Sequence, residues 1–179
     1  SLLAGTHPHL VPAMGQITGH PTDAQGLVMP LIDPILRNLA GPPSLQSCTR
    51  DTYAPSTRLS LPSLLKLIRA IASAAQHLHQ SGIVHGDLYA HNILHDGDGF
   101  ALLGDFGASS VGAATNEKMA HALHRMEVRA SGYLMEELLD RCDAALPPSL
   151  LQLRDDCLSE SPALRPLFQD ILNSLHACP

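Results

Sequence analysis

The clearest hydrophobic pattern in the chain lies between residues 61 and 80. Apolar side chains recur there every three or four positions, at Leu64, Ile68, Ile71, Ala75 and Leu78. This spacing is typical of the buried face of an amphipathic helix. Ser60 precedes the stretch as a candidate N-cap, and Gly82 follows it as a stop signal. The pattern predicts a core helix over 61–80.

Short apolar runs separated by turn residues predict strands on both sides of this helix. Before the helix, apolar pieces within 9–17 and 26–30 predict two strands joined by a polar loop. After the helix come the runs 83–84, 93–94 and 100–103. An Asp- and Gly-rich turn separates the last two runs, and it predicts a hairpin.

The rest of the chain reads as helices and one long loop. Asp33 as N-cap and Pro34 at the first helical position predict a helix that ends at Gly41. Residues 41–60, rich in Ser, Thr and Pro, predict a loop. From about Asn116 onward the pattern predicts helices over 127–139, over 149–158 and from near 166. The fold class is therefore α+β, mainly helical with short β-hairpins.

Composition and charge exclude several classes of protein. With 179 residues, the chain corresponds to one domain or a piece of one. A hydrophobic fraction of 45% argues against disorder. A net charge of −6 and the absence of a basic cluster argue against nucleic-acid binding. Lys66 and Arg69 interrupt the longest apolar run, so we expect no membrane span.

The cysteines and histidines point to no disulfide framework or zinc site. The four cysteines are scattered and form no C-x-x-C pair, so we expect reduced thiols in a cytoplasmic protein. Among the eleven histidines, the pairs His7/His9 and His77/His79 lack the i, i+4 spacing that puts two ligands on one helical face.

Three polar residues near the predicted hairpin suggest a chemistry. Asp87 and Asn92 lie on one loop between two short strands, and Asp105 ends the next strand. The hairpin brings Asn92 and Asp105 to the same end of the strand pair. One carboxylate and one carboxamide oxygen there suit Mg²⁺, and Asp87 is free to accept a proton. This combination is what phosphoryl transfer to a hydroxyl requires.

The same stretch resembles the protein-kinase superfamily. His85, Asp87 and Asn92, followed by Asp105-Phe106-Gly107, are similar to the superfamily's H-R-D-x-x-x-x-N and D-F-G motifs. The resemblance covers nearly the whole chain and includes a C-x-x-x-x-P-x-x-R-P segment over 157–166. It is closest to bacterial Ser/Thr kinases of the eukaryotic type.

The resemblance implies a protein-kinase-like fold whose small lobe is mostly missing. Residues 1–32 would be a remnant of the small lobe, with two strands and the hinge, and 33–179 would be the large lobe. Asp87 would be the catalytic base, and Asn92 and Asp105 would hold magnesium ions on ATP.

The resemblance also assigns the adenine pocket. Met29 would guard its back, and Leu94 would form its floor. The backbone C=O of Pro30 and the N–H of Ile32 would bind the adenine, because proline lacks only the donor, which is not needed at its position. Asp105 would contribute to nucleotide binding through its metal ion.

Structural roles are implied by the same resemblance. His85 would pack under Phe106 and bond to backbone, and Glu127 would bond to the backbone of the loop that carries Asp87. Glu117 is a candidate partner for Arg165.

The sequence departs from the superfamily in several places. It contains no glycine-rich loop and no strand lysine, so we expect a fragment, with a missing small-lobe segment N-terminal to Ser1. A degenerate remnant is the alternative. Gly86 and Tyr89 stand where relatives usually carry arginine and lysine.

The expected function is ATP- and Mg²⁺-dependent transfer of the γ-phosphate to a Ser/Thr hydroxyl of a protein substrate. The chain alone would be inactive, because nothing in it holds the phosphates in line. Two alternatives remain open: a small-molecule phosphotransferase of the aminoglycoside or choline type, and a pseudokinase that acts as a binding module.

Overall fold

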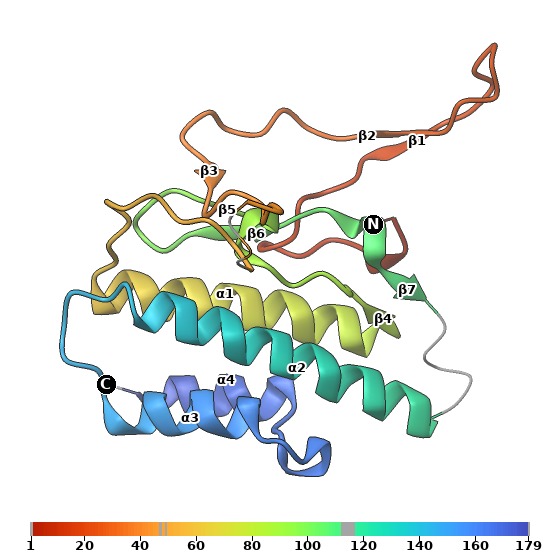
Figure 1. Ribbon diagram of the computed structural model, residues 1–179. Helices are drawn as coiled ribbons and strands as arrows, with labels where there is room; N and C mark the ends of the chain where they lie inside the picture. Colours follow the sequence, from red (N-terminus) through yellow and green to blue (C-terminus); the bar gives the residue numbers. More distant parts are fainter. Residues whose placement is uncertain (1, 47, 49, 112–116, 179) are drawn as a thin grey trace.

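The computed structural model describes residues 2–46, 48, 50–111 and 117–178. Within these residues, a layer of helices carries short strands on one side (Figure 1). The α-helices are α1 (Leu61–Gln80), α2 (Glu117–Leu139), α3 (Pro148–Leu158) and α4 (Phe168–His176). The 3-10 turns are η1 (Leu2–Ala4), η2 (Ala90–Asn92), η3 (Phe106–Ala108) and η5 (Pro162–Leu164). The observed elements agree with the expected α+β class.

The strands form small antiparallel sheets. They are β1 (Gly15–Ile17), β2 (Gly26–Val28), β3 (Arg37–Asn38), β4 (Ile83–Val84), β5 (Ile93–His95), β6 (Ala101–Leu103) and β7 (Ser110–Val111). β1 pairs with β2, β5 lies between β3 and β6, and β4 pairs with β7. Ile93 lies opposite Leu103, which confirms the predicted hairpin.

Helix α1 is the centre of the core and confirms the strongest sequence prediction. It spans Leu61–Gln80, and the hydroxyl of Ser60 accepts a hydrogen bond from the Ser63 amide at 3.3 Å. Gly82 follows with a φ of +70°, which suits glycine after a helix end. The apolar face of α1 packs against α4, α2, β4 and β6.

The helix predicted from Asp33 to Gly41 is wrong. The Asp33 carboxylate instead accepts a hydrogen bond from the Ile35 amide at 2.9 Å, and the chain turns there and enters β3. Asp-Pro begins type I turns as well as helices. The pairing of Arg37 with His95 and of Asn38 with Leu94 then holds the segment in extended form.

Helix α2 begins ten residues before its predicted start, at Glu117 rather than Glu127. The sequence pattern finds only the half whose apolar side chains face the core, including Val128 and Leu138. In the earlier half Met119 and Met126 are exposed, so no apolar stripe marks it. The side chain of Glu117, the expected partner of Arg165, lies outside the described residues.

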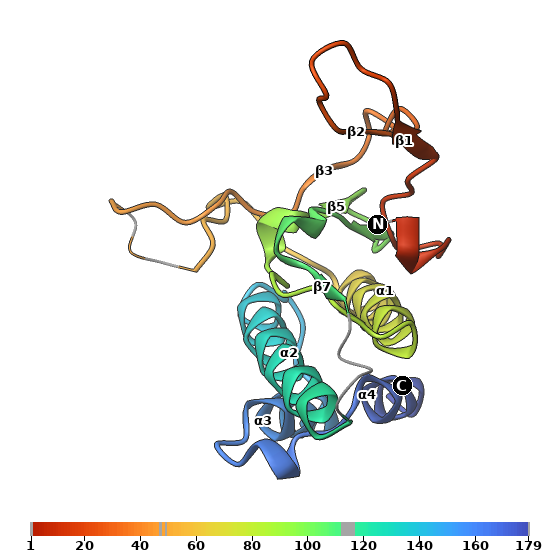
Figure 2. The ribbon, with the colours of Figure 1, turned by 90° about the vertical axis from the view of Figure 1, so that its right-hand side faces the viewer.

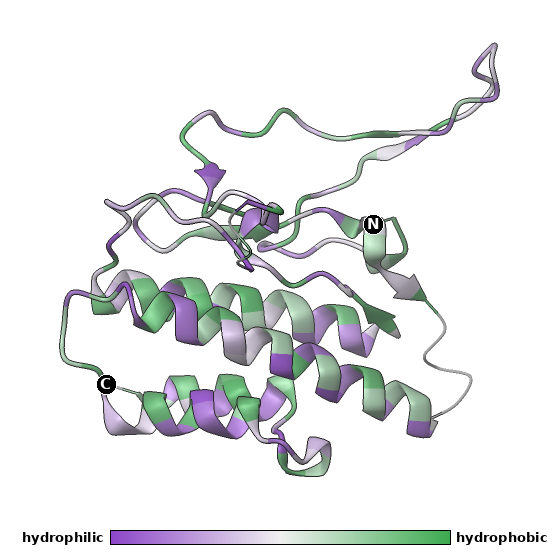
Figure 3. Cartoon of the chain, in the orientation of Figure 1, coloured by the Kyte–Doolittle hydropathy of each residue, from purple (hydrophilic) through white to green (hydrophobic). Residues whose placement is uncertain are grey.

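The hairpin of β1 and β2 projects away from the helices (Figure 2). Apolar residues lie along it, as Figure 3 shows, yet Ile17, Leu27, Val28 and Met29 are all exposed. We call residues 11–32 the front segment and residues 61–111 and 117–178 the body. None of the helices in the described part of the chain is long and apolar enough to cross a membrane.

Candidate functional site

The loop between β4 and β5, residues 85–92, brings the predicted base and metal ligand together. The side-chain amide of Asn92 donates to the Asp87 carboxylate at 2.9 Å and to the Asp87 carbonyl at 3.0 Å. The Gly104 amide donates to the Asn92 carbonyl at 2.9 Å, which places the start of the Asp105 segment beside Asn92. The hairpin thus unites the three residues as the sequence predicts.

Asp105 has an unusual backbone conformation. Its φ of +52° lies in the left-handed region, and its carboxylate accepts a hydrogen bond from the Gly107 amide at 3.1 Å. Non-glycine residues held in this region cluster at functional sites, where the surrounding structure maintains the strain. The conformation leaves Asp105 exposed at the mouth of a cavity.

His85 has the predicted structural role. It is fully buried, its Nε2 lies 2.8 Å from the Gly104 carbonyl, and its ring centroid lies 5.2 Å from that of Phe106. It therefore ties loop 85–92 to the Asp105 segment.

Glu127 anchors the same loop from α2, as the resemblance implies. The Gly86 amide donates to the Glu127 carboxylate at 2.8 Å, and His79 Nε2 lies 2.6 Å from its other oxygen. Burial alone would raise the pKa of Glu127. The hydrogen bond to His79, the positive charge of His79 and the hydrogen bond from the Gly86 amide together lower this pKa below its ordinary value. The anchor is therefore a buried carboxylate.

The structure explains why glycine occupies position 86. Gly86 has a φ of +81°, and a Cβ there would lie 2.5 Å from the Ala108 carbonyl oxygen. An arginine could not occupy this position without a backbone shift.

A cavity of about 610 Å³ lies beside Asp105. It is lined by Val11, Leu27, Met29, Asn38, His91, Asn92, Leu94, Gly104, Asp105, Phe106 and Gly107. Met29 and Leu94, predicted at the back and floor of an adenine pocket, thus share one cavity with both predicted metal ligands. Pro30 and Ile32 are half-buried and are not among its lining residues.

A second cavity, of about 670 Å³, also has His91 in its lining. It is lined by Pro42, Pro43, Cys48, Arg50, Asp87, Tyr89 and His91. Asp87 therefore faces a space separate from the first cavity. Arg50 and Asp51, which contact this part of the loop, were not predicted from the sequence.

The oxygen atoms at the site fit magnesium. The side-chain nitrogen of Asn92 donates to Asp87, so the side-chain oxygen of Asn92 stays available for a metal ion. One carboxylate oxygen of Asp105 accepts from Gly107, and the other is available for the same ion. Mg²⁺ commonly takes one or two carboxylate-type ligands and completes its shell with water and phosphate. Among the described residues, no group of three or more His, Cys, Asp or Glu could hold a metal ion.

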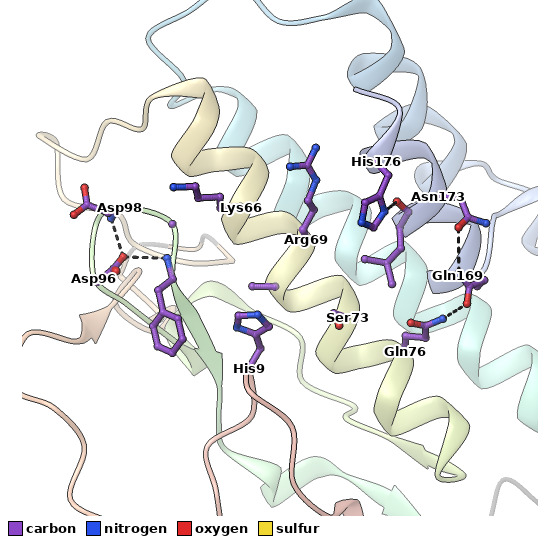
Figure 4. A pocket seen from close by; sticks show the side chains of 14 residues that line it. His9, Lys66, Arg69, Ser73, Gln76, Asp96, Asp98, Gln169, Asn173 and His176 are labelled. Carbon is purple, nitrogen blue, oxygen red and sulfur yellow. Dashed lines mark hydrogen bonds between the residues drawn. The ribbon is translucent and has the colours of Figure 1, made fainter. Parts of the chain in front are cut away.

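A larger cavity, of about 750 Å³, is not part of this site. Figure 4 shows that Lys66 and Arg69 of α1, Asp96 and Asp98 of the β5–β6 turn, and His176 of α4 surround it. It shares no lining residue with the two cavities beside loop 85–92.

Comparisons with known proteins agree with these motifs. A profile of the family described as protein tyrosine and serine/threonine kinase matches residues 2–140. SNF1-activating kinase 1 of Saccharomyces cerevisiae is 35% identical over 66 residues, which cover 37% of this chain and 6% of that protein. The serine/threonine-protein kinase AtPK1/AtPK6 of Arabidopsis thaliana is 57% identical over 37 residues, which cover 21% of this chain and 8% of that protein.

A longer match shows a lower identity. The serine/threonine-protein kinase STY17 of Arabidopsis thaliana is 27% identical over 154 residues, which cover 64% of this chain and 27% of that protein. The chain thus spans only a small part of the length of these curated relatives.

Proposed function

The chain belongs to the protein tyrosine and serine/threonine kinase family, and from this premise we propose that it is the large lobe of a Ser/Thr protein kinase. The reaction is transfer of the γ-phosphate of ATP, with Mg²⁺, to a hydroxyl of a protein substrate. The observation that carries the proposal is the contact between Asp87 and Asn92 beside Asp105, with His91 in the lining of two neighbouring cavities.

We assign nucleotide binding to one cavity and binding of the acceptor hydroxyl to the other. In the 610 Å³ cavity, Leu94 and Met29 offer apolar contact to a nucleotide base, while Asn92 and Asp105 would hold magnesium. Bound magnesium would neutralise charge on the phosphates. In the 670 Å³ cavity, Asp87 would accept a hydrogen bond from the acceptor hydroxyl and orient it.

The hinge assignment stays a proposal. The C=O of Pro30 and the N–H of Ile32 would bind adenine only if the hinge moves closer to the 610 Å³ cavity, because neither residue lines it. Further strands packed on the exposed apolar hairpin of β1 and β2 would supply such a movement and would complete a small lobe.

Ser/Thr specificity is supported by the names of two of the relatives, AtPK1/AtPK6 and STY17, which are serine/threonine-protein kinases. The match to the protein-kinase profile favours a protein substrate over a small-molecule acceptor. The metal-ligating side chains are present, which favours an enzyme over a pseudokinase. We propose a cytoplasmic location, which accords with the free state of the four cysteines.

We expect the chain by itself to transfer no phosphate, because positioning of the phosphates supplies most of the catalysis in this reaction. The test therefore compares residues 1–179 with the same chain fused behind a small lobe that contains a glycine-rich loop and a strand lysine. Both are incubated with γ-labelled ATP, Mg²⁺ or EDTA, and a protein acceptor.

The fused protein should label serine and threonine in the presence of Mg²⁺ only. Asp87→Asn should lower the rate at least 100-fold, within the usual range for loss of a general base, while Asp98→Asn in the β5–β6 turn serves as the control. Labelling that survives Asp87→Asn, or that reaches an aminoglycoside or choline but no protein, would contradict the proposal.

A further inference from the structure

Two adjacent residues of the loop 41–60 hold three consecutive residues of loop 85–92. The Asp51 carboxylate accepts a hydrogen bond from the Ala90 amide at 2.8 Å, and its other oxygen lies 2.6 Å from His91 Nδ1. The Arg50 guanidinium carbon lies 4.3 Å from the centroid of the Tyr89 ring. Contacts of this kind join the two loops through every residue from 89 to 91.

Burial shows that Asp51 is a fixed part of this arrangement. Its side chain is 0% exposed, and a carboxylate is buried so completely only when its oxygens are paired. Paired backbone hydrogen bonds of 2.8 and 2.9 Å between Gly41 and Thr52 hold the neighbouring backbone. The carboxylate is therefore presented to Ala90 and His91 from a tethered strand-like segment.

Arg50 is tied to the body as well. Its Nε lies 3.0 Å from the Glu137 carboxylate on α2, and the Tyr53 hydroxyl donates to the other Glu137 oxygen at 3.0 Å. The Arg50 guanidinium also lies 5.0 Å from the ring centroid of Tyr133. The guanidinium therefore lies close to two aromatic rings, those of Tyr89 and Tyr133.

These contacts bear on the transfer site because the two residues after Ala90 belong to that site. His91 lines both cavities, and Asn92, the next residue, bonds to Asp87. A shift of the 89–91 segment would therefore move a residue that lines both cavities and pull Asn92 away from Asp87. Glu127 holds only the other end of the loop, at Gly86.

We propose that Arg50 and Asp51 form a clamp that positions loop 85–92 for phosphoryl transfer. The inference deepens the proposed function and rests on it. Asp51 is the positioning residue for Asn92 and, through it, for Asp87. Arg50 places a cation beside Tyr89, in the lining of the cavity that Asp87 also lines.

The clamp can be tested on the full chain by NMR, without ATP. Three signals report on it: exchange of the Ala90 amide, the His91 Nδ1 proton, and the side-chain amide of Asn92. Asp51→Ala should speed Ala90 exchange at least ten-fold, remove the His91 signal and shift the Asn92 signal. Asp143→Ala, an exposed carboxylate between α2 and α3, is the matched control and should change none of them.

The variant Asp51→Asn distinguishes the two hydrogen bonds of the Asp51 carboxylate, one from the Ala90 amide and one from His91. Its amide oxygen can still accept a hydrogen bond from the Ala90 amide, but its NH₂ group only donates and cannot accept a hydrogen bond from His91 Nδ1. Ala90 should therefore stay protected while the His91 signal is lost. This partial rescue is not expected of a residue that only adds to global stability.

Several results would overturn the clamp. Wild-type protein without a protected Ala90 amide, or an unchanged Asn92 signal in Asp51→Ala, would do so. If Asp51→Ala does not fold, Asp51→Asn decides, and an unaltered His91 signal there contradicts the proposal. Exchange that rises equally in α1 and α4 would show a general structural role. Because the NMR signals need no turnover, failure of the clamp and failure of the proposed kinase activity can be told apart.

Discussion

The body and the front segment differ in how far their large apolar side chains are buried. In the body, Leu64, Ile71, Leu138 and Phe168 are buried to 2% exposure or less. In the front segment, Leu31 is 97% exposed. The body has its own core, whereas the hairpin of β1 and β2 has only itself to pack against, and isolated two-stranded hairpins are marginally stable.

This difference divides the candidate site as well. Asp87, Asn92 and Asp105 all belong to the body, where Asn92 bonds to Asp87 and accepts a hydrogen bond from Gly104, the neighbour of Asp105. The opposite wall of the 610 Å³ cavity comes from the front segment, through Leu27 and Met29. The polar residues of the candidate site therefore lie in the body, whereas Leu27 and Met29 of the cavity lining lie in the front segment.

The largest difference between the two regions should appear in how much a substitution lowers the free energy of unfolding. Phe168 is 1% exposed and packs edge-on against His79, with the two ring centroids 5.0 Å apart. Phe168→Ala should lower the free energy of unfolding by about 3–5 kcal/mol, because it leaves a cavity in the core. Leu31→Ala should change it by about 0.5 kcal/mol or less. Urea denaturation checks both, and equal losses would mean that the two regions do not differ.

The anchor of loop 85–92 should have the next largest effect. Glu127→Gln should cost about 1–3 kcal/mol of unfolding free energy, because a glutamine cannot accept from both Gly86 and His79. Glu136→Gln on the same helix is the control.

The anchor also has a pH dependence. The lowered pKa of Glu127 stabilises the fold above its ordinary value of 4.5, and this contribution is lost as the pH falls through the folded-state pKa. Glu127→Gln should lack this acid-dependent loss. Parallel pH curves for the two proteins between 3 and 6, on the order of the ordinary Glu range, would contradict the anchor.

His124 should make the body more sensitive to mild acid. Burial, and then the charge of His79, lower its pKa from 6.5 to about 4, and Glu127 opposes this only in part. His124 stacks on His79 with ring centroids 3.8 Å apart and also faces His121.

Because its folded pKa is depressed, the unfolded chain binds the proton first. Stability should therefore fall as the pH drops from 6.5 toward 4. His124→Phe keeps a ring and removes the titration, so its stability should depend less on pH in this range. Denaturation at several pH values measures this, and an unchanged slope would count against it.

The smallest effect on stability belongs to the front segment. Leu27→Ala should change the unfolding free energy by about 0.5 kcal/mol or less, since the side chain is 47% exposed. It should still weaken ATP binding, by about 1 kcal/mol or less, because it removes apolar wall from the cavity. Calorimetry and denaturation on the same variant separate the two effects, and a large loss of stability would break the comparison.

The sequence predicts those parts in which local signals and packing agree. The periodic stripe of α1 and its cap at Ser60 predict the helix correctly, and the hairpin between Asn92 and Asp105 predicts their juxtaposition. The Asp33-Pro34 signal fails because it fits two local structures, and only the pairing of β3 with β5 decides between them. The local sequence pattern around Asp33 contains no information about this pairing with a distant strand.

Asp51 illustrates the other limit. It lies in a Ser- and Pro-rich loop with no periodicity, far upstream of the residues it holds, and nothing in its neighbours marks it. Only the fold shows its two oxygens facing Ala90 and His91. A single buried carboxylate within a predicted loop could have been singled out only by its position in three dimensions.

Titration calorimetry of ATP binding tests most directly whether the body carries the metal-dependent site. Residues 1–179 should bind ATP with Mg²⁺ and lose that binding with EDTA. Asp105→Ala should weaken Mg²⁺-dependent binding at least ten-fold, about 1.4 kcal/mol, whereas Asp87→Asn and Asp98→Asn should leave it intact. Binding that is independent of Mg²⁺, or that survives Asp105→Ala unchanged, would contradict a metal site held by the body.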